Sequence, residues 1–377
     1  MDFGTKLIHN GNEIDKNTGA LSVPIYQTST FHQEDIDNPP EFEYARSGNP
    51  TRKALESTMA ILENGDRGFA FSSGMAAVSS ILAMFKSGDH IIVGEDVYGG
   101  TYRVTSKLFI NFGLKVSFVN TTDLKNVVNS IEADTKAIFL ETPSNPLLKI
   151  TDLKGAIKIA KEKNILVVVD NTFLSPYIQR PLDLGPDIVW HSATKFLGGH
   201  SDVVAGIVVT AREDLSKRLA FVQNTFGAIL GPQDSWLLLR GIKTLKVRLD
   251  YQCASAEKVA RWLSESPYVS EVYYPGLLKH EGRDIHFGQA SKGGAVLSFK
   301  AKDVSTAKKF MSQVKLAAVA VSLGGVETIV SYPVKMSHAT VAKEEREKLG
   351  ITDELIRISV GLEDTEDLIS DFGRAFK

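Results

Sequence analysis

The most constraining feature of this sequence is a regular alternation of helix-like and strand-like runs between residues 51 and 244. Helical patterns such as TRKALESTMAILENG and DLKGAIKIAKEKN alternate with short apolar runs such as DHIIVGED, TKAIFLET and ILVVVDNT. The strand-like runs are apolar at successive positions, which is typical of strands that are buried on both faces. The alternation therefore predicts an α/β fold with a mostly parallel sheet and helices on both of its faces.

The segments on either side of this region have different patterns. Residues 1–50 are rich in Asn, Pro, Ser and Thr and include NPPEFEYARSGNPTR, so we predict an irregular arm that lies on another surface. Residues 245–377 contain a long helical pattern, strand-like runs such as AVLSFKA, and a terminal helical run, TEDLISDFGRAF. They predict a smaller C-terminal α/β domain beside a major domain formed by residues 51–244.

Charge and apolar patterning exclude several classes of partner. The 43 Lys and Arg residues nearly balance the 45 Asp and Glu residues, which leaves no broad positive field for nucleic acid or an anionic membrane. The longest apolar runs fall far short of the roughly 20 residues of a membrane span, and the N-terminus lacks the apolar region of a signal peptide. We therefore expect a cytoplasmic protein that binds a small molecule.

Neither a disulfide nor a metal site is expected. The single cysteine, Cys253, lies in a helical pattern and is predicted to be a packed thiol. The 8 histidines show no HExxH motif and no paired-ligand spacing. The chemistry must therefore come from other residues.

The strongest local signal is the segment DIVWHSATKFLGGHSD, residues 187–202, in which Lys195 follows a strand-like run. Small residues surround this lysine: Ser192, Thr194, Gly198 and Gly199. They would let a phosphorylated cofactor approach closely while hydroxyl groups bind its oxygens. An isolated lysine is more often solvated or ion-paired, but this setting suits an amine that forms an imine.

Asp170 ends the strand-like run ILVVVDNTF, which reads as fully buried. A buried carboxylate needs a cationic or hydrogen-bonding partner, and a protonated pyridine nitrogen is such a partner. A protonated pyridine ring is also an electron sink that stabilises a substrate carbanion. Alone, Asp170 would more often be a strand-end cap, but beside Lys195 we predict that it pairs with a pyridinium.

A third segment, FAFSSGMAAVSS, places Ser73, Gly74 and Met75 where a strand passes into a helix. Free backbone amides and the helix dipole form an anion site at such a junction. The signal is weak by itself, because most α/β proteins contain such turns. The segment has neither GxGxxG nor GxxxxGK, so a dinucleotide-binding fold or a nucleotide triphosphatase has little support.

Together these residues resemble the Cys/Met-metabolism family of pyridoxal-phosphate enzymes, which includes cystathionine β-lyase, cystathionine γ-lyase and cystathionine γ-synthase. The resemblance runs nearly from end to end and is carried by VPIYQTSTF, YARSGNPTR, FSSGMAA, DVYGGTYR, ETPSNPLL, VVDNTF, HSATKFLGGHSDV, VSLGGVET and LIRISVGLED. It implies the fold of type I pyridoxal-phosphate enzymes, which is similar to that of aspartate aminotransferase. It also implies pyridoxal 5′-phosphate as cofactor and a homotetramer built as a dimer of dimers.

The resemblance assigns roles around the cofactor ring. Lys195 would hold pyridoxal phosphate as a Schiff base and later carry a proton to or from the substrate α-carbon. Asp170 would pair with the pyridine nitrogen. Tyr98 would stack on the ring, because an aromatic face suits a flat cofactor, and would take a proton from the incoming amine.

The phosphate group would be bound by two subunits. By resemblance, Ser73, Gly74, Met75, Ser192 and Thr194 would hold it within one subunit. Tyr44 and Arg46, in the N-terminal arm, would reach the phosphate of a neighbouring subunit, where the planar fork of arginine suits a phosphate. Without the resemblance, Tyr44 and Arg46 would be read as surface-loop residues.

Substrate recognition would centre on Arg357, with Ser322 and Asn145 assisting. An arginine that binds a carboxylate through two hydrogen bonds fixes the orientation of the substrate over the ring. Alone, Arg357 would more often be a structural ion pair. Arg103 has two equal interpretations, a contact to a distal substrate carboxylate or a helix-surface residue.

The reaction within the family depends on the leaving group. Val321 stands where γ-synthases and many γ-lyases of the family carry glutamate, and with the segment VSYPVKMSHA it favours a β-lyase over a γ-lyase. The expected reaction is cleavage of L-cystathionine to homocysteine, pyruvate and ammonia, with Lys195 as acid and base. γ-Elimination and γ-synthesis remain alternatives.

Two readings from other classes have less support. A non-catalytic regulator that binds the cofactor would often lack the lysine or carry an added DNA-binding domain. This sequence has Lys195, and we expect no added N-terminal domain. A cofactor-free Schiff-base aldolase in a barrel would need the eightfold βα repeat, which the chain lacks.

Overall fold

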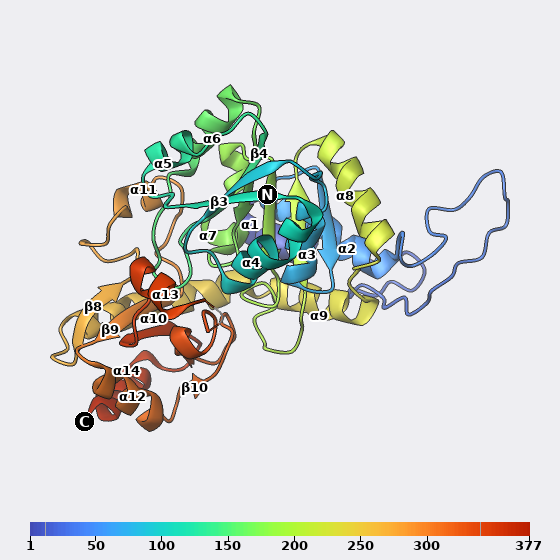
Figure 1. The fold of residues 1–377 in the computed structure, drawn as a ribbon. Helices are drawn as coiled ribbons and strands as arrows, with labels where there is room; N and C mark the ends of the chain where they lie inside the picture. The colour runs from blue at the N-terminus through green and yellow to red at the C-terminus, as the bar shows by residue number, and fades with distance from the viewer. Residues whose placement is uncertain (12, 340) are drawn as a thin grey trace.

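The computed structural model describes residues 1–377 apart from 12 and 340, and it contains two β-sheets with their covering helices (Figure 1). In the first part of the chain the elements are α1 (Phe3–His9), α2 (Pro50–Glu63), β1 (Arg67–Phe71), α3 (Gly74–Leu82), β2 (His90–Gly94), α4 (Gly99–Arg103), η1 (Val104–Leu108), η2 (Phe109–Phe112), β3 (Lys115–Val119), α5 (Leu124–Asn129), β4 (Thr135–Glu141), α6 (Leu153–Glu162), β5 (Leu166–Asp170), α7 (Ser175–Ile178), η3 (Pro181–Leu184), β6 (Ile188–Ser192), β7 (Gly206–Thr210), α8 (Glu213–Phe226) and α9 (Pro232–Ile242).

The second part of the chain supplies the smaller sheet. Its elements are α10 (Leu245–Ser264), β8 (Val269–Tyr273), α11 (Arg283–Phe287), β9 (Val296–Ala301), α12 (Val304–Gln313), β10 (Ala318–Val319), β11 (Ile329–Ser331), η4 (Pro333–Lys335), α13 (Lys343–Leu349), β12 (Leu355–Ser359) and α14 (Thr365–Phe376). Among the described helices, none is both long and apolar enough to cross a membrane.

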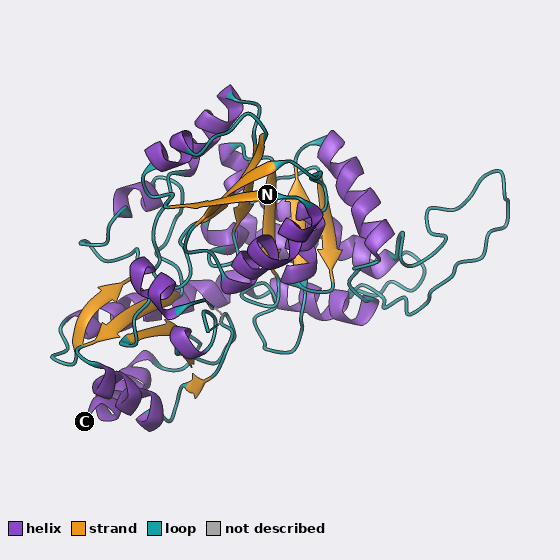
Figure 2. Ribbon diagram, in the orientation of Figure 1, coloured by secondary structure: helices purple, strands orange, loops and turns teal. Residues whose placement is uncertain are grey.

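The larger sheet has seven strands in the order β1-β7-β6-β5-β4-β2-β3. Strands β6, β5, β4, β2 and β3 are parallel, and β7 is antiparallel to both of its neighbours, β1 and β6. Strand β5 is apolar at successive positions because both of its faces are buried. Val168 belongs to one apolar cluster and Val169 to the other. The predicted mostly parallel sheet, buried on both faces, is therefore confirmed (Figure 2).

Side chains at the first turns explain where the helices begin. Asn49 accepts hydrogen bonds from the amides of Thr51 and Arg52, and Pro50 occupies the first turn of α2. Ser73 caps α3 and Asp152 caps α6 in the same way. The caps at Ser73 and Asp152 follow β1 and β4 at the edge of the large sheet where parallel strands place their carboxyl ends, whereas Asn49 begins α2 directly after the N-terminal arm.

The smaller sheet has the order β10-β11-β12-β9-β8 and is mainly antiparallel. Its apolar face packs with α10, α12 and α14, whose buried residues share one cluster with Phe299 of β9 and Ile356 of β12. Cys253 lies in α10 and is buried, as expected. Helix α10 begins at Leu245, where we placed the start of the second domain, and that domain division stays a prediction.

Between α1 and α2, the described residues of the N-terminal segment form irregular backbone with isolated bridges such as Thr30 with Tyr44. Its outer loop extends away from the two sheets (Figure 1). The buried side chain of Arg52 attaches the base of the arm to α2, because its guanidinium donates to the backbone oxygens of Ala45 and Arg46. The arm thus has a fixed base and an exposed outer part.

Arg248 of α10 connects the two parts of the chain. Its guanidinium is buried and donates to the backbone oxygens of Phe196 and Gly241, each at 2.9 Å. Gly199 must lack a side chain here, because a Cβ atom would lie 2.2 Å from Nη1 of Arg248 and because its backbone has a φ of +74°. Arg248 therefore fixes the backbone that directly follows Lys195.

We predict that Arg248→Met lowers the free energy of unfolding by about 2–4 kcal/mol, because two buried carbonyl groups lose charged hydrogen-bond donors. Arg261→Met, on the same helix but with an exposed side chain that pairs with Glu257, is the matched control and should change it by less than about 0.5 kcal/mol. Urea unfolding followed by circular dichroism measures both. Equal effects of the two substitutions would contradict the role given to Arg248.

Candidate active site

A cavity of about 490 Å³ lies at the carboxyl ends of β4, β5 and β6. This edge of a parallel sheet is the usual place for ligands in α/β folds. The N-terminus of α3 and the start of α4 form part of its wall, and residues of the smaller sheet close it from the other side. Of the predicted site residues, those that line the cavity are Ser73, Gly74, Met75, Tyr98, Arg103, Asn145, Asp170, Ser192, Thr194, Lys195, Ser322 and Arg357.

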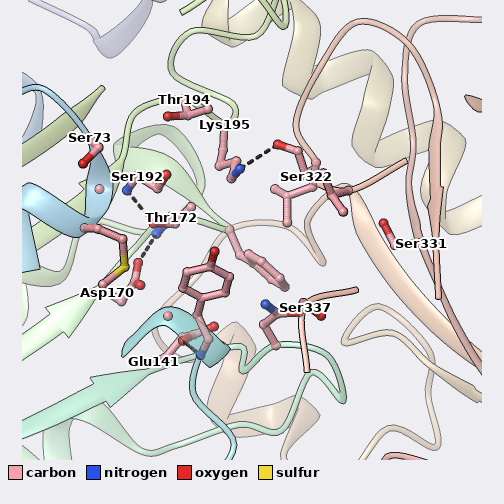
Figure 3. A pocket seen from close by; sticks show the side chains of 18 of the residues that line it. Ser73, Glu141, Asp170, Thr172, Ser192, Thr194, Lys195, Ser322, Ser331 and Ser337 are labelled. Carbon is pink, nitrogen blue, oxygen red and sulfur yellow. Dashed lines mark hydrogen bonds between the residues drawn. The ribbon is translucent and has the colours of Figure 1, made fainter. Parts of the chain in front are cut away.

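Lys195 reaches the cavity from the turn that follows β6. Its Nζ donates to Oγ of Ser322 at 2.6 Å (Figure 3), and it forms no ion pair with any described carboxylate. Burial, and to a lesser degree the charge of Arg357, lowers the pKa of Lys195 to about 8. At pH 7 a minor fraction of this amine, on the order of one tenth, is therefore neutral and nucleophilic, which is far more than for an ordinary lysine.

The loop that carries Ser322 can pack against Lys195 only because Gly324 follows it. A Cβ atom at Gly324 would lie 2.6 Å from the amide of Phe196 and 2.9 Å from the carbonyl carbon of Lys195. Gly324 and Ser322 both have positive φ, +82° and +86°, a conformation that L side chains rarely adopt. This close approach explains Gly324 of VSLGGVET and places the hydroxyl of Ser322, from the loop between β10 and β11, beside the lysine.

Asp170 is the last residue of β5 and is buried. Its Oδ1 accepts a hydrogen bond from the amide of Thr172 at 2.9 Å, and it forms no ion pair with a described cation. Burial raises its pKa to about 6. A cationic nitrogen in the cavity would satisfy this carboxylate.

The N-terminus of α3 has the features of a phosphate cradle. The amides of Gly74 and Met75 stand in the first turn, where no intrahelical acceptor is available. A Cβ atom at Gly74 would lie 2.9 Å from Oγ of Ser192, so only glycine lets these segments approach. The hydroxyls of Ser73 and Thr194 bond to the backbone of Ala76 and Ala205, and they therefore shape the cradle as well as line it.

Arg357 of β12 is a buried guanidinium without a carboxylate partner among the residues that the structure describes. Its Nη1 donates to Oδ1 of Asn145 at 2.8 Å, and its Nη2 donates to the backbone oxygen of Ser322 at 2.7 Å. Its buried Nε has no hydrogen-bond partner, and burial lowers its pKa to about 10. A neutral setting of this kind suits an anionic ligand, because the ligand would supply the missing negative charge.

The donor set fits pyridoxal phosphate. The cavity joins an amine of lowered pKa, a buried carboxylate for a cationic nitrogen, an amide cradle for a phosphate, and a guanidinium for an amino-acid carboxylate. Tyr98 adds an aromatic side chain at the rim, and a Cβ atom at Gly100 would lie 2.4 Å from its ring. The residues thus match each chemical group of that cofactor and of an amino-acid substrate.

Tyr44 and Arg46 do not line the cavity of their own chain. Arg46 packs on the ring of Tyr44, 5.3 Å from its centroid, and its Nε donates to Oδ1 of Asn224. Tyr44 is 44% exposed. Their predicted role at a neighbouring subunit stays a prediction.

Sequence reasoning missed several residues that line the cavity, among them Glu141, Thr172, Trp190, Ser331 and Ser337. Glu141 ends β4 as Asp170 ends β5, so the same strand-end signal could have identified it. The other four carry no local pattern that separates them from ordinary core or turn residues. They are brought to the cavity by the fold.

Comparisons with known proteins agree with this donor set. The profile of a family described as "Cys/Met metabolism PLP-dependent enzyme" matches residues 4–377. The chain is 52% identical to "Cystathionine beta-lyase MetC" of Bacillus subtilis, covering 99% of this chain and 96% of that protein. It is 50% identical to "Cystathionine gamma-lyase" of the same organism, covering 100% of both.

A solved structure is also similar. The crystal structure of cystathionine γ-lyase from Lactobacillus plantarum complexed with L-serine matches with a TM-score of 0.98 and 46% identity, covering 100% of this chain and 98% of that one. The fold and the cofactor expected from the sequence are confirmed. The chain belongs to the pyridoxal-phosphate-dependent enzymes of Cys/Met metabolism.

Proposed function

We propose that this protein is a cystathionine β-lyase, which converts L-cystathionine and water to homocysteine, pyruvate and ammonia. The observation that carries the choice of substrate is the 52% identity to the Bacillus subtilis cystathionine β-lyase over nearly all of both chains. When bound, pyridoxal phosphate supplies an electron sink for negative charge at the substrate α-carbon. The residues of this chain bind, orient and transfer protons.

Lys195 is the proposed attachment point of the cofactor and the proton carrier. Its lowered pKa of about 8 allows the amine to accept a proton at the substrate α-carbon and to return one to the leaving sulfur. The hydrogen bond to Ser322 holds the amine on the side of the cavity from which Arg357 also projects. Asp170 is the proposed partner of the pyridine nitrogen.

Arg357 is the proposed site for the substrate α-carboxylate, with Asn145 and Ser322 holding the guanidinium in place. Two-point binding of a carboxylate fixes the angle between the scissile bond and the ring plane. Arg103 lines the cavity at the end of α4, which supports its proposed contact to the distal end of the substrate. Tyr98 is the proposed stacking residue.

Phosphate binding is proposed to involve two subunits. Ser73, the amides of Gly74 and Met75, Ser192 and Thr194 would contribute from one chain. Tyr44 and Arg46 would contribute from a neighbouring chain, and the extended arm with its exposed tyrosine supports this arrangement. We propose a homotetramer in the cytoplasm, with residues 1–50 as arm, residues 51–244 as cofactor domain and residues 245–377 as C-terminal domain.

γ-Elimination is the second candidate, because a cystathionine γ-lyase is 50% identical to this chain and another has nearly the same fold. Val321 favours the β-reaction. Its side chain is 66% exposed at the wall of the cavity, where a glutamate would place a charge beside the substrate. The two reactions differ in their products.

We predict that the purified protein converts cystathionine mainly to pyruvate and homocysteine, with the keto acid identified by mass spectrometry. Lys195→Ala is the inactive control, and Lys217→Ala, at an exposed position on α8, is the active one. A predominance of 2-oxobutyrate and cysteine would replace the β-lyase assignment by γ-lyase. Absence of both keto acids would reject both.

We predict that Arg357→Ala raises KM for cystathionine by about 10- to 150-fold, which corresponds to the loss of about 1.5–3 kcal/mol from a charged hydrogen-bonded pair. Steady-state kinetics with the cofactor in excess measures this change. The exposed Arg374→Ala is the matched arginine control. A KM equal to that of the unsubstituted enzyme would remove Arg357 from substrate binding.

A further inference from the structure

Two acidic side chains lie next to one another at the end of the large sheet. Glu141 ends β4 and Asp170 ends β5, and the parallel register pairs these two residues directly. Both are buried, both line the cavity, and neither forms an ion pair with a described cation. Figure 3 shows them on the same side of the cavity, away from the bond between Lys195 and Ser322.

Glu141 has a contact that Asp170 lacks. Its Oε2 accepts a hydrogen bond from the backbone amide of Tyr98 at 2.8 Å. Tyr98 directly precedes α4, and its own side chain makes no capping bond there. The next two residues, Gly99 and Gly100, begin α4 and carry no side chain that could anchor this turn. The bond from Glu141 therefore restrains the segment that carries the Tyr98 ring.

The charges around Glu141 favour its neutral form. Burial raises its pKa well above the ordinary value, and the charge of Asp170 raises it further. Asp96 acts in the same direction, whereas the Tyr98 amide and Arg357 act against it. A neutral carboxylic acid can still accept the Tyr98 amide through its carbonyl oxygen. Two adjacent buried carboxylates would repel one another, so one of them is best kept protonated.

We propose that Glu141 is a positioning residue, a neutral buried acid that holds Tyr98 at the cofactor and leaves Asp170 as the one carboxylate facing the ring nitrogen. This inference rests on the proposed function of the cavity as a pyridoxal-phosphate site. Glu141 acts through two neighbours: it restrains the backbone of Tyr98, and by remaining uncharged it adds no second negative charge beside Asp170. It does not itself take part in proton transfer.

The test compares Glu141→Gln with Glu141→Ala in the full-length protein. Glutamine has the same shape, no charge and a carbonyl oxygen for the Tyr98 amide, so it should keep the apparent Kd for pyridoxal phosphate within about twofold. Alanine removes the acceptor and should weaken that Kd about tenfold, the effect of one buried hydrogen bond, and should reduce the visible circular dichroism of bound cofactor. Both readouts are independent of turnover.

Two controls separate this role from a general loss of structure. Glu345→Ala removes an acid that contacts Tyr102 of α4 outside the cavity, and it should leave the cofactor signal unchanged. In a Tyr98→Ala background, Glu141→Ala should weaken cofactor binding by less than about threefold, because the side chain that it positions is gone.

Three results would overturn the proposal. Glutamine as damaging as alanine would show that Glu141 must be charged. Alanine equal to the unsubstituted protein would show that Glu141 positions nothing. A full tenfold effect in the Tyr98→Ala background would show that it does not act through Tyr98. If the unsubstituted protein bound no pyridoxal phosphate, the proposed function would fail instead, before any variant is compared.

Discussion

The structure depends on buried charges that are kept apart inside one cavity. Lys195 and Arg357 enter it without a described carboxylate partner, and Asp170 enters it without a described cation. Burying unpaired charges is costly, and the shifted pKa values of all three groups express that cost. Pyridoxal phosphate and an amino acid together carry the complementary groups. The cofactor and the substrate would therefore supply the charges that these three buried groups lack.

The fold keeps the buried charges of the cavity apart. Adjacent parallel strands end at one edge, so Asp170 on β5 and the turn after β6 that carries Lys195 are neighbours without being partners. The smaller sheet brings Arg357 from the opposite side, and Gly324 lets its loop contact the backbone of Lys195. Arg248 holds the same backbone segment through its hydrogen bond to the oxygen of Phe196. Each contact joins segments that are distant in sequence, which makes the cavity a product of both sheets.

The parts of this account that sequence could predict are those with a local signal. The apolar run before Asp170 predicted a buried strand, and Ser73 and Gly74 predicted a strand-to-helix turn, because caps and burial depend on neighbouring residues. The grouping of Arg357, Asn145 and Ser322 came from family resemblance alone, since no local pattern reports a contact between residues so far apart. Glu141 ends an apolar strand as Asp170 does, so a local signal for it existed, but its direct pairing with Asp170 follows only from the strand register.

The central claim is that the buried, partly neutral amine of Lys195 binds the cofactor covalently. Borohydride reduction of the protein with pyridoxal phosphate, followed by peptide mapping, tests it most directly, because reduction converts the imine to a stable pyridoxyl adduct. The account predicts one major adduct on Lys195, with exposed lysines such as Lys217 unlabelled at equimolar cofactor. An adduct distributed over exposed lysines, with none on Lys195, would contradict it.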